Sequence, residues 1–289
     1  MSTPEAQVAT PEIVISPPSR WSSLHLGELW AHRELIYFLT KRELQVRYKQ
    51  SFFGISWAVL QPLIYGFIFA LFFGIVLKVQ PPGNLPYAVF AVAGLVPWLF
   101  TAQAVTNGSN SLVQDSDLIS KVYFPRLALP ISKALSLLMD LAIALAVVIV
   151  VTLIYGVAIA PTAYLVPAFL MLGVITAFAI GTWLAAVNVK YRDVQVVVPM
   201  LVQVLFFVSP VLYSGTQVGD QAGKAWSYIY SINPMASVLD GMRWALYGGT
   251  GAPYPGTANI LISVASAALI LTGALVYFRR TEQSFADVI

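Results

Sequence analysis

Long apolar stretches, separated by short polar ones, dominate the chain. A helix that crosses a bilayer needs about 20 mostly apolar residues to cover roughly 30 Å of hydrocarbon. Turn signals such as Pro81-Pro82 and Pro161-Thr162 divide the apolar stretches from one another. The pattern predicts an all-α integral membrane protein whose membrane domain, residues 51–280, has six spanning helices. They are expected at residues 54–77, 86–106, 132–156, 163–187, 194–213 and 258–278.

An amphipathic helix is expected ahead of the first span, within residues 21–50. Apolar side chains recur there at spacings of four and seven residues, which places them on one helical face, and cations occupy other faces. A helix of this kind lies in the interface of an anionic membrane. A basic cluster that only fixes the orientation of the first span is the alternative. The residues assigned to this interface helix are Trp30, Tyr37, Lys41, Arg42, Arg47, Tyr48 and Lys49.

The connection between the fifth and sixth spans, residues 215–256, is too long for a simple turn. Its apolar part is interrupted by Asn233-Pro234, which disfavours one straight helix. Non-helical backbone is tolerated at membrane depth where protein or a water-filled cavity surrounds it. We therefore predict a re-entrant external hairpin of short helices, with an ordinary folded loop as the alternative. Asp240 and Arg243, three residues apart, can pair on one helical face.

Charge excludes a soluble fold and sets the orientation. Only 10% of the residues are charged and 58% are apolar, against about 25% and about 45–50% in soluble proteins. Cytoplasmic loops carry an excess of Lys and Arg. If both ends lie in the cytoplasm, 13 of the 16 Lys and Arg residues fall on the inner side. Residues 1–20, which lack the features of a signal peptide, are expected to be a disordered cytoplasmic tail. Residues 281–289 are expected to form the cytoplasmic C-terminal tail.

Several kinds of site are excluded. The chain has no cysteine and both histidines precede the first span, so no metal site is expected. The phosphate-binding motif Gly-x-x-x-x-Gly-Lys-[Ser/Thr] is absent, because its nearest approach, Gly223-Lys224, has Val218 and Ala225 at two required positions. Asp140 is the one clear acid inside a span. We expect it to bond to a neighbouring helix rather than to couple transport to an ion.

The polar segment between the second and third spans, residues 115–130, has the features of a docking helix. Asp115 or Ser116 can cap a short helix that ends near Tyr123, because Pro125 discourages its continuation. A short helix of this kind can fit a groove on a soluble partner, whereas a mere connector has no need of apolar side chains. The apolar side chains that it would present are Leu118, Ile119, Val122 and Tyr123.

Motifs in four regions carry a family resemblance. They are Arg47-Tyr48-Lys49-Gln50 with Gly54 and Trp57-Ala58-Val59-Leu60-Gln61-Pro62, Leu118-Ile119-Ser120-Lys121-Val122-Tyr123-Phe124-Pro125-Arg126 with Leu129-Pro130, Tyr191-Arg192-Asp193 with Pro199, Ser209-Pro210 and Tyr213, and Asn233-Pro234. In this order the chain resembles the ABC transporter type 2 permeases over roughly residues 28–280. The nearest branch exports lipid-linked polysaccharides such as O-antigen, teichoic acid and capsule.

The resemblance implies a division of labour between subunits. A homodimer of this permease in the bacterial cytoplasmic (inner) membrane would pair with two copies of a cytoplasmic ABC ATPase. ATP and Mg would be bound by that partner, so this chain needs no cofactor and no catalytic residue, and no nucleic acid takes part. The external hairpin would form a gate with Asn233, Pro234, Asp240 and Arg243. The residues implied to couple to the ATPase are Asp115, Asp117, Leu118, Ile119, Lys121, Val122, Tyr123, Arg126, Arg192 and Asp193.

Aromatic side chains are the candidates for the substrate path. Amphipathic aromatic faces can contact sugars without holding any one geometry tightly, and the resemblance implies a channel lined by aromatics. Packing between helices is the alternative role for each of them. The candidates are Tyr65, Phe69, Phe100, Phe206, Phe207 and Tyr213.

The expected function is that of a permease subunit that moves an undecaprenyl-linked glycan outward when a partner ATPase hydrolyses ATP. An ABC exporter of another lipid or of a drug is the first alternative. The second is a membrane-embedded polyprenyl-lipid transferase. That enzyme would need acidic metal-binding clusters, and Asp115 and Asp117 are the only close acidic pair.

Overall fold

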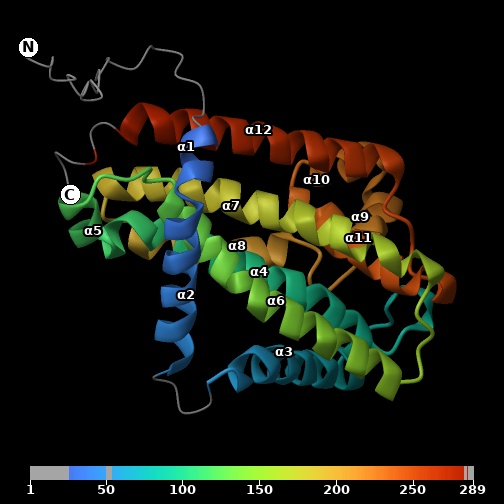
Figure 1. Ribbon diagram of the computed structural model, residues 1–289. Helices are drawn as coiled ribbons and strands as arrows, with labels where there is room; N and C mark the ends of the chain where they lie inside the picture. Colours follow the sequence, from blue (N-terminus) through green and yellow to red (C-terminus); the bar gives the residue numbers. More distant parts are fainter. Residues whose placement is uncertain (1–25, 50–53, 283–284, 286–289) are drawn as a thin grey trace, which may run out of the picture.

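The chain folds into a bundle of long helices with a pair of shorter ones lying across it (Figure 1). The computed structural model describes residues 26–49, 54–282 and 285. The tail predicted for residues 1–20 therefore lies outside the described residues, and so does most of the predicted C-terminal tail. Within the described ranges every regular element is helical.

Five helices in the described part of the chain are long and apolar enough to cross a membrane. Their bounds are Ser56–Val76, formed by α3 (Ser56–Phe69) and a π-helical continuation (Ala70–Val76), then α4 (Tyr87–Gln114), α6 (Ala128–Ile154), Pro161–Lys190, which ends in α7 (Val166–Lys190), and α12 (Thr257–Glu282). They match five of the six predicted spans. Their ends differ from the predicted ones because the helices continue into polar segments such as residues 107–114.

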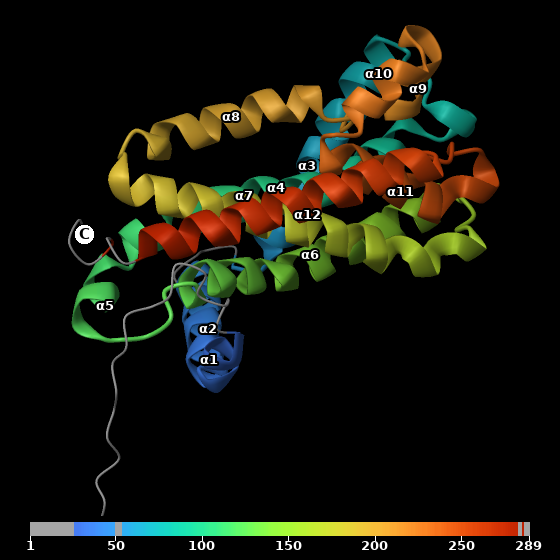
Figure 2. The same ribbon diagram turned by 90° about the horizontal axis from the view of Figure 1, so that it is seen from above.

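The predicted fifth span is shorter in the structure than in the sequence pattern. Its helix, α8 (Val194–Val208), has 15 residues, which rise roughly 22 Å in total at about 1.5 Å per residue. It ends because Ser209-Pro210 opens a turn. Figure 2 shows α8 leading from the end of the bundle where α5 (Ser116–Lys121) lies toward α9 (Gly215–Ala222) and α10 (Lys224–Tyr230) at the opposite end. The count of six spans stays a prediction.

The connection from 215 to 256 contains three short helices instead of the two that were predicted. They are α9 (Gly215–Ala222), α10 (Lys224–Tyr230) and α11 (Pro234–Tyr247). Asn233 and Pro234 mark the break, as expected, because Asn233 caps α11 by accepting a hydrogen bond from the Met235 backbone N–H at 3.1 Å. Helix α11 is almost entirely buried and packs on α4, α7 and α12.

The helix expected at the membrane surface is present as α1 (Leu26–Ala31) and α2 (Arg33–Lys49), which meet at His32. It runs crosswise to the long helices (Figure 1) and contacts α6. Leu29 and Leu39 are buried against the bundle, whereas Trp30 and Tyr37 are exposed. The face that carries Trp30 and Tyr37 is therefore free to meet lipid, and a different apolar face packs on the protein.

Small residues let the central helices approach closely. Helix α4 packs most extensively on α7 and α6. A Cβ atom placed on Gly108 of α4 would lie 3.1 Å from the Gly181 Cα of α7, and one placed on Gly181 would lie 3.2 Å from the Ala104 carbonyl oxygen. In a membrane, where lipid is as apolar as a side chain, contact of this kind is a main source of helix association.

Replacing Gly181 with Val should therefore destabilise the bundle. The added methyl groups meet the α4 backbone, and overpacking of this type costs about 1–3 kcal/mol. Thermal unfolding of the detergent-solubilised protein measures the effect. The matched control is Gly273→Val on α12, where a Cβ atom would meet nothing within 4 Å. Equal midpoints for the two variants would contradict close packing of α4 on α7.

Candidate functional site

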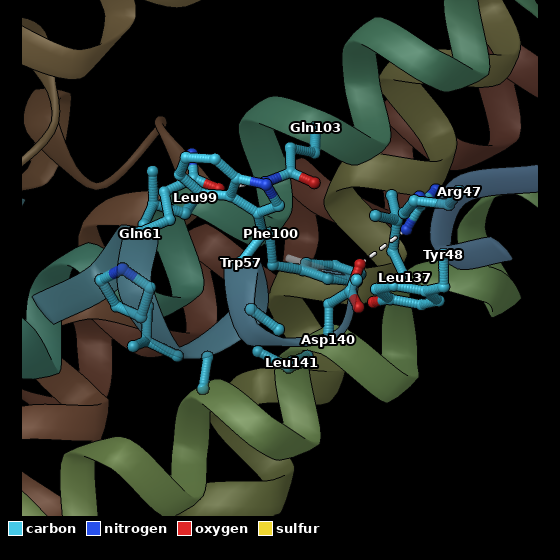
Figure 3. A pocket seen from close by; sticks show the side chains of 15 residues that line it. Arg47, Tyr48, Trp57, Gln61, Leu99, Phe100, Gln103, Leu137, Asp140 and Leu141 are labelled. Carbon is cyan, nitrogen blue, oxygen red and sulfur yellow. Dashed lines mark hydrogen bonds and ion pairs between the residues drawn. The ribbon is translucent and has the colours of Figure 1, made fainter. Parts of the chain in front are cut away.

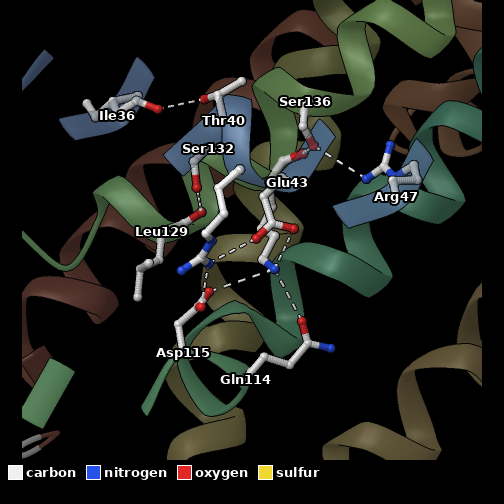
Figure 4. Close-up of polar contacts among 11 residues, drawn as sticks. Ile36, Thr40, Glu43, Arg47, Gln114, Asp115, Leu129, Ser132 and Ser136 are labelled. Atoms are coloured by element: carbon white, nitrogen blue, oxygen red, sulfur yellow. Dashed lines mark hydrogen bonds and ion pairs between the residues drawn. The ribbon is translucent and has the colours of Figure 1, made fainter. Parts of the chain in front are cut away.

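Helix α2 directs an arginine into the protein, at the edge of the bundle. Arg47 Nη1 donates to Asp140 Oδ2 on α6 at 2.6 Å (Figure 3), and Arg47 Nη2 lies 3.4 Å from the Ser136 hydroxyl (Figure 4). The bond predicted between Asp140 and a neighbouring helix is confirmed. The structure corrects the expectation that Arg47 faces lipid headgroups, because an acid inside a span needs a partner more than a surface cation does.

The Arg47–Asp140 pair lines a cavity of about 110 Å³ between α2, α3, α4 and α6. Gln61 of α3 and Gln103 of α4 also line it, and Gln103 Nε2 donates to Gln61 Oε1 at 3.3 Å. Phe100 contributes its ring to the wall. Sequence reasoning missed this cavity because its walls come from four helices whose relative rotation the hydrophobic pattern does not give.

A second group of ion pairs joins α2 to the start of α5 and to α6 (Figure 4). Arg42 lies 2.5 Å from Asp115 Oδ1 and 3.0 Å from Glu43 Oε1. Lys133 of α6 lies 2.8 Å from Glu43 Oε2 and 3.8 Å from Asp115 Oδ2, and donates to the Gln114 side-chain oxygen at 3.3 Å. We call Arg42, Glu43, Asp115 and Lys133 the ion cluster.

Burial makes the pairing of charges in the ion cluster important for the stability of the fold. The Lys133 side chain is only 8% exposed, and a buried ammonium without an acidic partner is very costly. Burial by itself would raise the pKa of Glu43, but the hydrogen bonds and charges of Lys133 and Arg42 outweigh it and hold that pKa below its ordinary value. Burial likewise disfavours the Arg42 cation, and Glu43 and Asp115 together raise its pKa in spite of that. Both shifts favour the charged forms of Glu43 and Arg42.

Helix α5 differs in two ways from the expected docking helix. Asp115 occupies the capping position, but its side chain makes no cap bond, because it is engaged with Arg42 and Lys133. Ile119 is buried against Leu112 and Phe124 of this same chain, which corrects the expectation that it faces outward. The exposed side chains come directly after α5, which ends at Lys121: Tyr123 is 92% exposed, with Val122 beside it. Asp117 and Lys121, both highly exposed, lie 3.8 Å apart on the same helix.

The other coupling residues divide into an exposed pair and an internal one. Arg192 and Asp193, in the turn between α7 and α8, are exposed, and Figures 1 and 2 place this turn at the same end of the bundle as α5. Arg126 is used within the chain. Its guanidinium donates to the Glu282 carbonyl and lies over the ring of Phe285, so it ties the segment after α5 to the end of α12.

The predicted substrate-path aromatics are brought together only in part. Phe69 of α3 stacks on Phe206 of α8 with ring centroids 5.8 Å apart, and Phe206 contacts Phe207 at 5.2 Å and Trp98 at 5.8 Å. Trp98 was missed because a buried tryptophan on α4 reads as ordinary packing. Tyr65, exposed on α3, and Phe100, which lines the cavity beside Arg47, have no ring contact with this group among the described residues. The Tyr213 hydroxyl reaches the Phe207 carbonyl oxygen at 3.1 Å and the Tyr230 hydroxyl at 2.7 Å.

At the other end of the bundle, the predicted gate residues clamp the turn that follows α8. Arg243 donates to the carbonyl oxygens of Pro210 at 2.6 Å and of Tyr213 at 3.1 Å. Asp240 accepts from the Gly215 N–H at 2.8 Å and pairs with Arg243 at 3.5 Å. The predicted pairing of Asp240 with Arg243 is confirmed.

The same turn is held from a third side. Asn233 Nδ2 donates to the Ser209 hydroxyl at 2.9 Å, so the Asn-Pro and Ser-Pro motifs singled out in the sequence contact each other. Asn233, Asp240 and Arg243 form the clamp on this turn; Asp240 and Arg243 are buried, and Asn233 is partly buried. Among the described residues, no three His, Asp or Glu side chains gather to hold a metal ion.

Comparisons with known proteins agree with the resemblance drawn from the sequence. Residues 34–247 match the family described as ABC-2 type transporter. An O-antigen export system permease protein, RfbA, of Myxococcus xanthus is 30% identical over 264 residues, which cover 91% of this chain and 98% of that protein. RfbA of Klebsiella pneumoniae is 29% identical over 227 residues, covering 78% and 84%. The polysialic acid transport protein KpsM of Escherichia coli is 26% identical over 214 residues, covering 72% and 79%. With the family match extending over most of its length and a relative similar from end to end, this chain belongs to the ABC-2 type transporter family of membrane proteins.

Proposed function

We propose that this chain is the permease subunit of an ATP-driven exporter that carries a lipid-linked polysaccharide outward across the cytoplasmic membrane. The observation that carries the proposal is the 30% identity to an O-antigen export permease over 98% of that protein's length. The long apolar helices support a path through lipid. The missing phosphate-binding motif supports an energy source on another subunit.

In the proposed assembly, six spans place both termini in the cytoplasm, and two copies of the permease meet two copies of a cytoplasmic ATPase. The ATPase would bind ATP and Mg and would seat on α5. Support for that seat comes from Val122 and Tyr123, which are exposed directly after α5, while Ile119 anchors the helix to its own bundle. The exposed turn with Arg192 and Asp193 supports a second, smaller contact at the same end.

The ion cluster connects α5, the proposed docking helix, to α2 and α6. Asp115 begins α5 and is held by Arg42 of α2 and Lys133 of α6. A displacement of α5 by the ATPase would therefore move α2, the helix at the membrane surface, without passing through flexible loops. Such a coupling needs an element that both ends can bias. The exposed Trp30 of α1 and Tyr37 of α2 support a role for these helices at the membrane surface.

Deleting the gene should stop export and leave undecaprenyl-linked polymer in the cytoplasm. The reason is that the polymer would still be made but would have no path through lipid. Extraction of the lipid-linked pool and staining of surface glycan measure the two pools, with a plasmid copy of the gene as control. Unchanged surface glycan would contradict the polysaccharide assignment and favour an exporter of another lipid or of a drug.

Replacing Tyr123 with Asp should release the ATPase while the permease stays folded. An exposed aromatic at the centre of an interface is typically worth 2 kcal/mol or more, about a thirtyfold change in affinity. Co-purification of the two subunits from membranes measures it. Tyr123→Phe is the matched control and should retain the ATPase. Full retention by Tyr123→Asp would show that the ATPase seats elsewhere.

Replacing Glu43 with Gln should destabilise the permease, because Lys133 loses its nearest carboxylate. We expect a loss on the order of 2 kcal/mol at neutral pH, with the exposed Glu34→Gln on the same helix as the control. Since folding depresses the pKa of Glu43, its contribution is present above the unfolded pKa and is lost as pH falls through the folded pKa. Thermal unfolding at acidic and neutral pH should show a smaller acid dependence in Glu43→Gln. An unchanged profile would rule out this role for the cluster.

A further inference from the structure

The cavity beside Arg47 and Asp140 has a polar lining at a depth where the bundle is otherwise apolar (Figure 3). Its polar walls come from Tyr48 of α2, Gln61 of α3, Gln103 of α4 and the ion pair itself. Its volume of about 110 Å³ exceeds the roughly 30 Å³ that one water occupies in the liquid. The cavity is thus large enough for a polar ligand group.

Two buried polar atoms at this cavity lack a partner within the described part of the chain. They are Asp140 Oδ1, whose neighbour Oδ2 takes the bond from Arg47, and the Tyr48 hydroxyl. Figure 3 shows the Tyr48 ring pointing toward the Asp140 carboxylate. A buried group left without a hydrogen bond costs about 1–3 kcal/mol, so each such group calls for an explanation. A ligand that supplies both an acceptor and a donor would satisfy the pair.

Charge narrows the chemistry of that ligand. Arg47 and Asp140 neutralise each other at 2.6 Å. A phosphate would meet the carboxylate, and a cation would meet the guanidinium, so neither has a favourable site. Neutral hydroxyl groups meet no such repulsion. They can donate to the free carboxylate oxygen, accept from the Tyr48 hydroxyl, and exchange bonds with Gln61 and Gln103, whose amides both donate and accept.

The apolar part of the lining fits the same ligand. Trp57 and Phe100 add aromatic faces to the wall, next to the polar groups. A sugar ring presents hydroxyls around its edge and C–H groups on its faces, so it matches a site that combines amides, a carboxylate and aromatic rings. A pyrophosphate or an acyl chain uses only one half of such a lining.

We propose that this cavity binds a neutral sugar residue of the lipid-linked glycan, close to the lipid carrier. The inference rests on the proposed function and adds the place where the cargo is recognised. The cavity lies where α2 meets the beginning of α3, on the side of the bundle assigned to the cytoplasm. A sugar attached to a lipid in the inner leaflet would reach this depth without leaving the membrane surface. Recognition there would select glycosylated carriers over bare ones before export begins.

The substitution Tyr48→Phe tests the site because it removes only the unpartnered hydroxyl. The probes are undecaprenyl pyrophosphate carrying one neutral hexose and the same lipid without the sugar, added to full-length permease with its ATPase in nanodiscs. Wild-type protein should bind the hexosyl lipid more tightly than the bare lipid. Tyr48→Phe should weaken binding of the hexosyl lipid about three- to tenfold, the value of one hydrogen bond, and leave the bare lipid unchanged. Tyr164→Phe, at an exposed tyrosine outside the cavity, is the matched control and should bind both probes like wild type.

A merely structural tyrosine gives a different result. Removing an unsatisfied hydroxyl would then leave the unfolding temperature equal or higher, with both affinities unchanged, and a cavity that holds only water would behave in the same way. Equal weakening for both probes would assign the cavity to the pyrophosphate. Unchanged affinities, or equal weakening for both probes, would each overturn the sugar site. Glycan export would continue in both cases. Failure of the proposed function appears elsewhere, as unchanged surface glycan after gene deletion.

Discussion

Pairing of charges at the edge of the membrane domain is the constraint on which the rest of this structure depends. Helix α2 lies across the long helices and brings two arginines and a glutamate to their sides. Lys133 and Asp140 belong to α6, and neither can be left alone where water is scarce. Helix α2 is thus attached both by these charges and by its apolar side chain Leu39, which is buried on the bundle. Tyr37 remains exposed, and the start of α5 is tied to α2 through Asp115.

Much of the fold follows from the order of apolar and polar residues. Spans with turn signals at both ends were placed correctly because twenty apolar residues have few alternatives to a transmembrane helix. The fifth span was overestimated because Ser209-Pro210 breaks the helix inside an apolar stretch that hydropathy alone treats as continuous. The extra helix in the 215–256 segment was missed for a related reason. Gly223, whose φ is positive, separates α9 from α10, and hydropathy carries no information about backbone conformation.

The site residues were less predictable than the spans. Sequence placed the cations of α2 on a lipid-facing side, but their partners lie 73 and 93 residues away in the chain, at Asp115 and Asp140. Long-range pairing of this kind leaves no periodic signal. Ile119 and Tyr123 are both apolar and four residues apart, yet one is buried and the other projects. The residue after α5 is already extended, which turns Tyr123 away from the face that Ile119 occupies.

The clamp around Arg243 has a consequence for how its end of the bundle can move. The Arg243 guanidinium donates hydrogen bonds to carbonyl groups of the turn after α8 and to the carbonyl of Phe90 in α4. It also stacks on the Phe90 ring. Pulling α8 away from α11 would strand a cation and several acceptors in a site with no solvent to replace them. The cheaper motion carries α4, the end of α8 and α11 as one rigid block. Any opening at this end of the bundle would then occur along the borders of that block, while Arg243 and its partners move together.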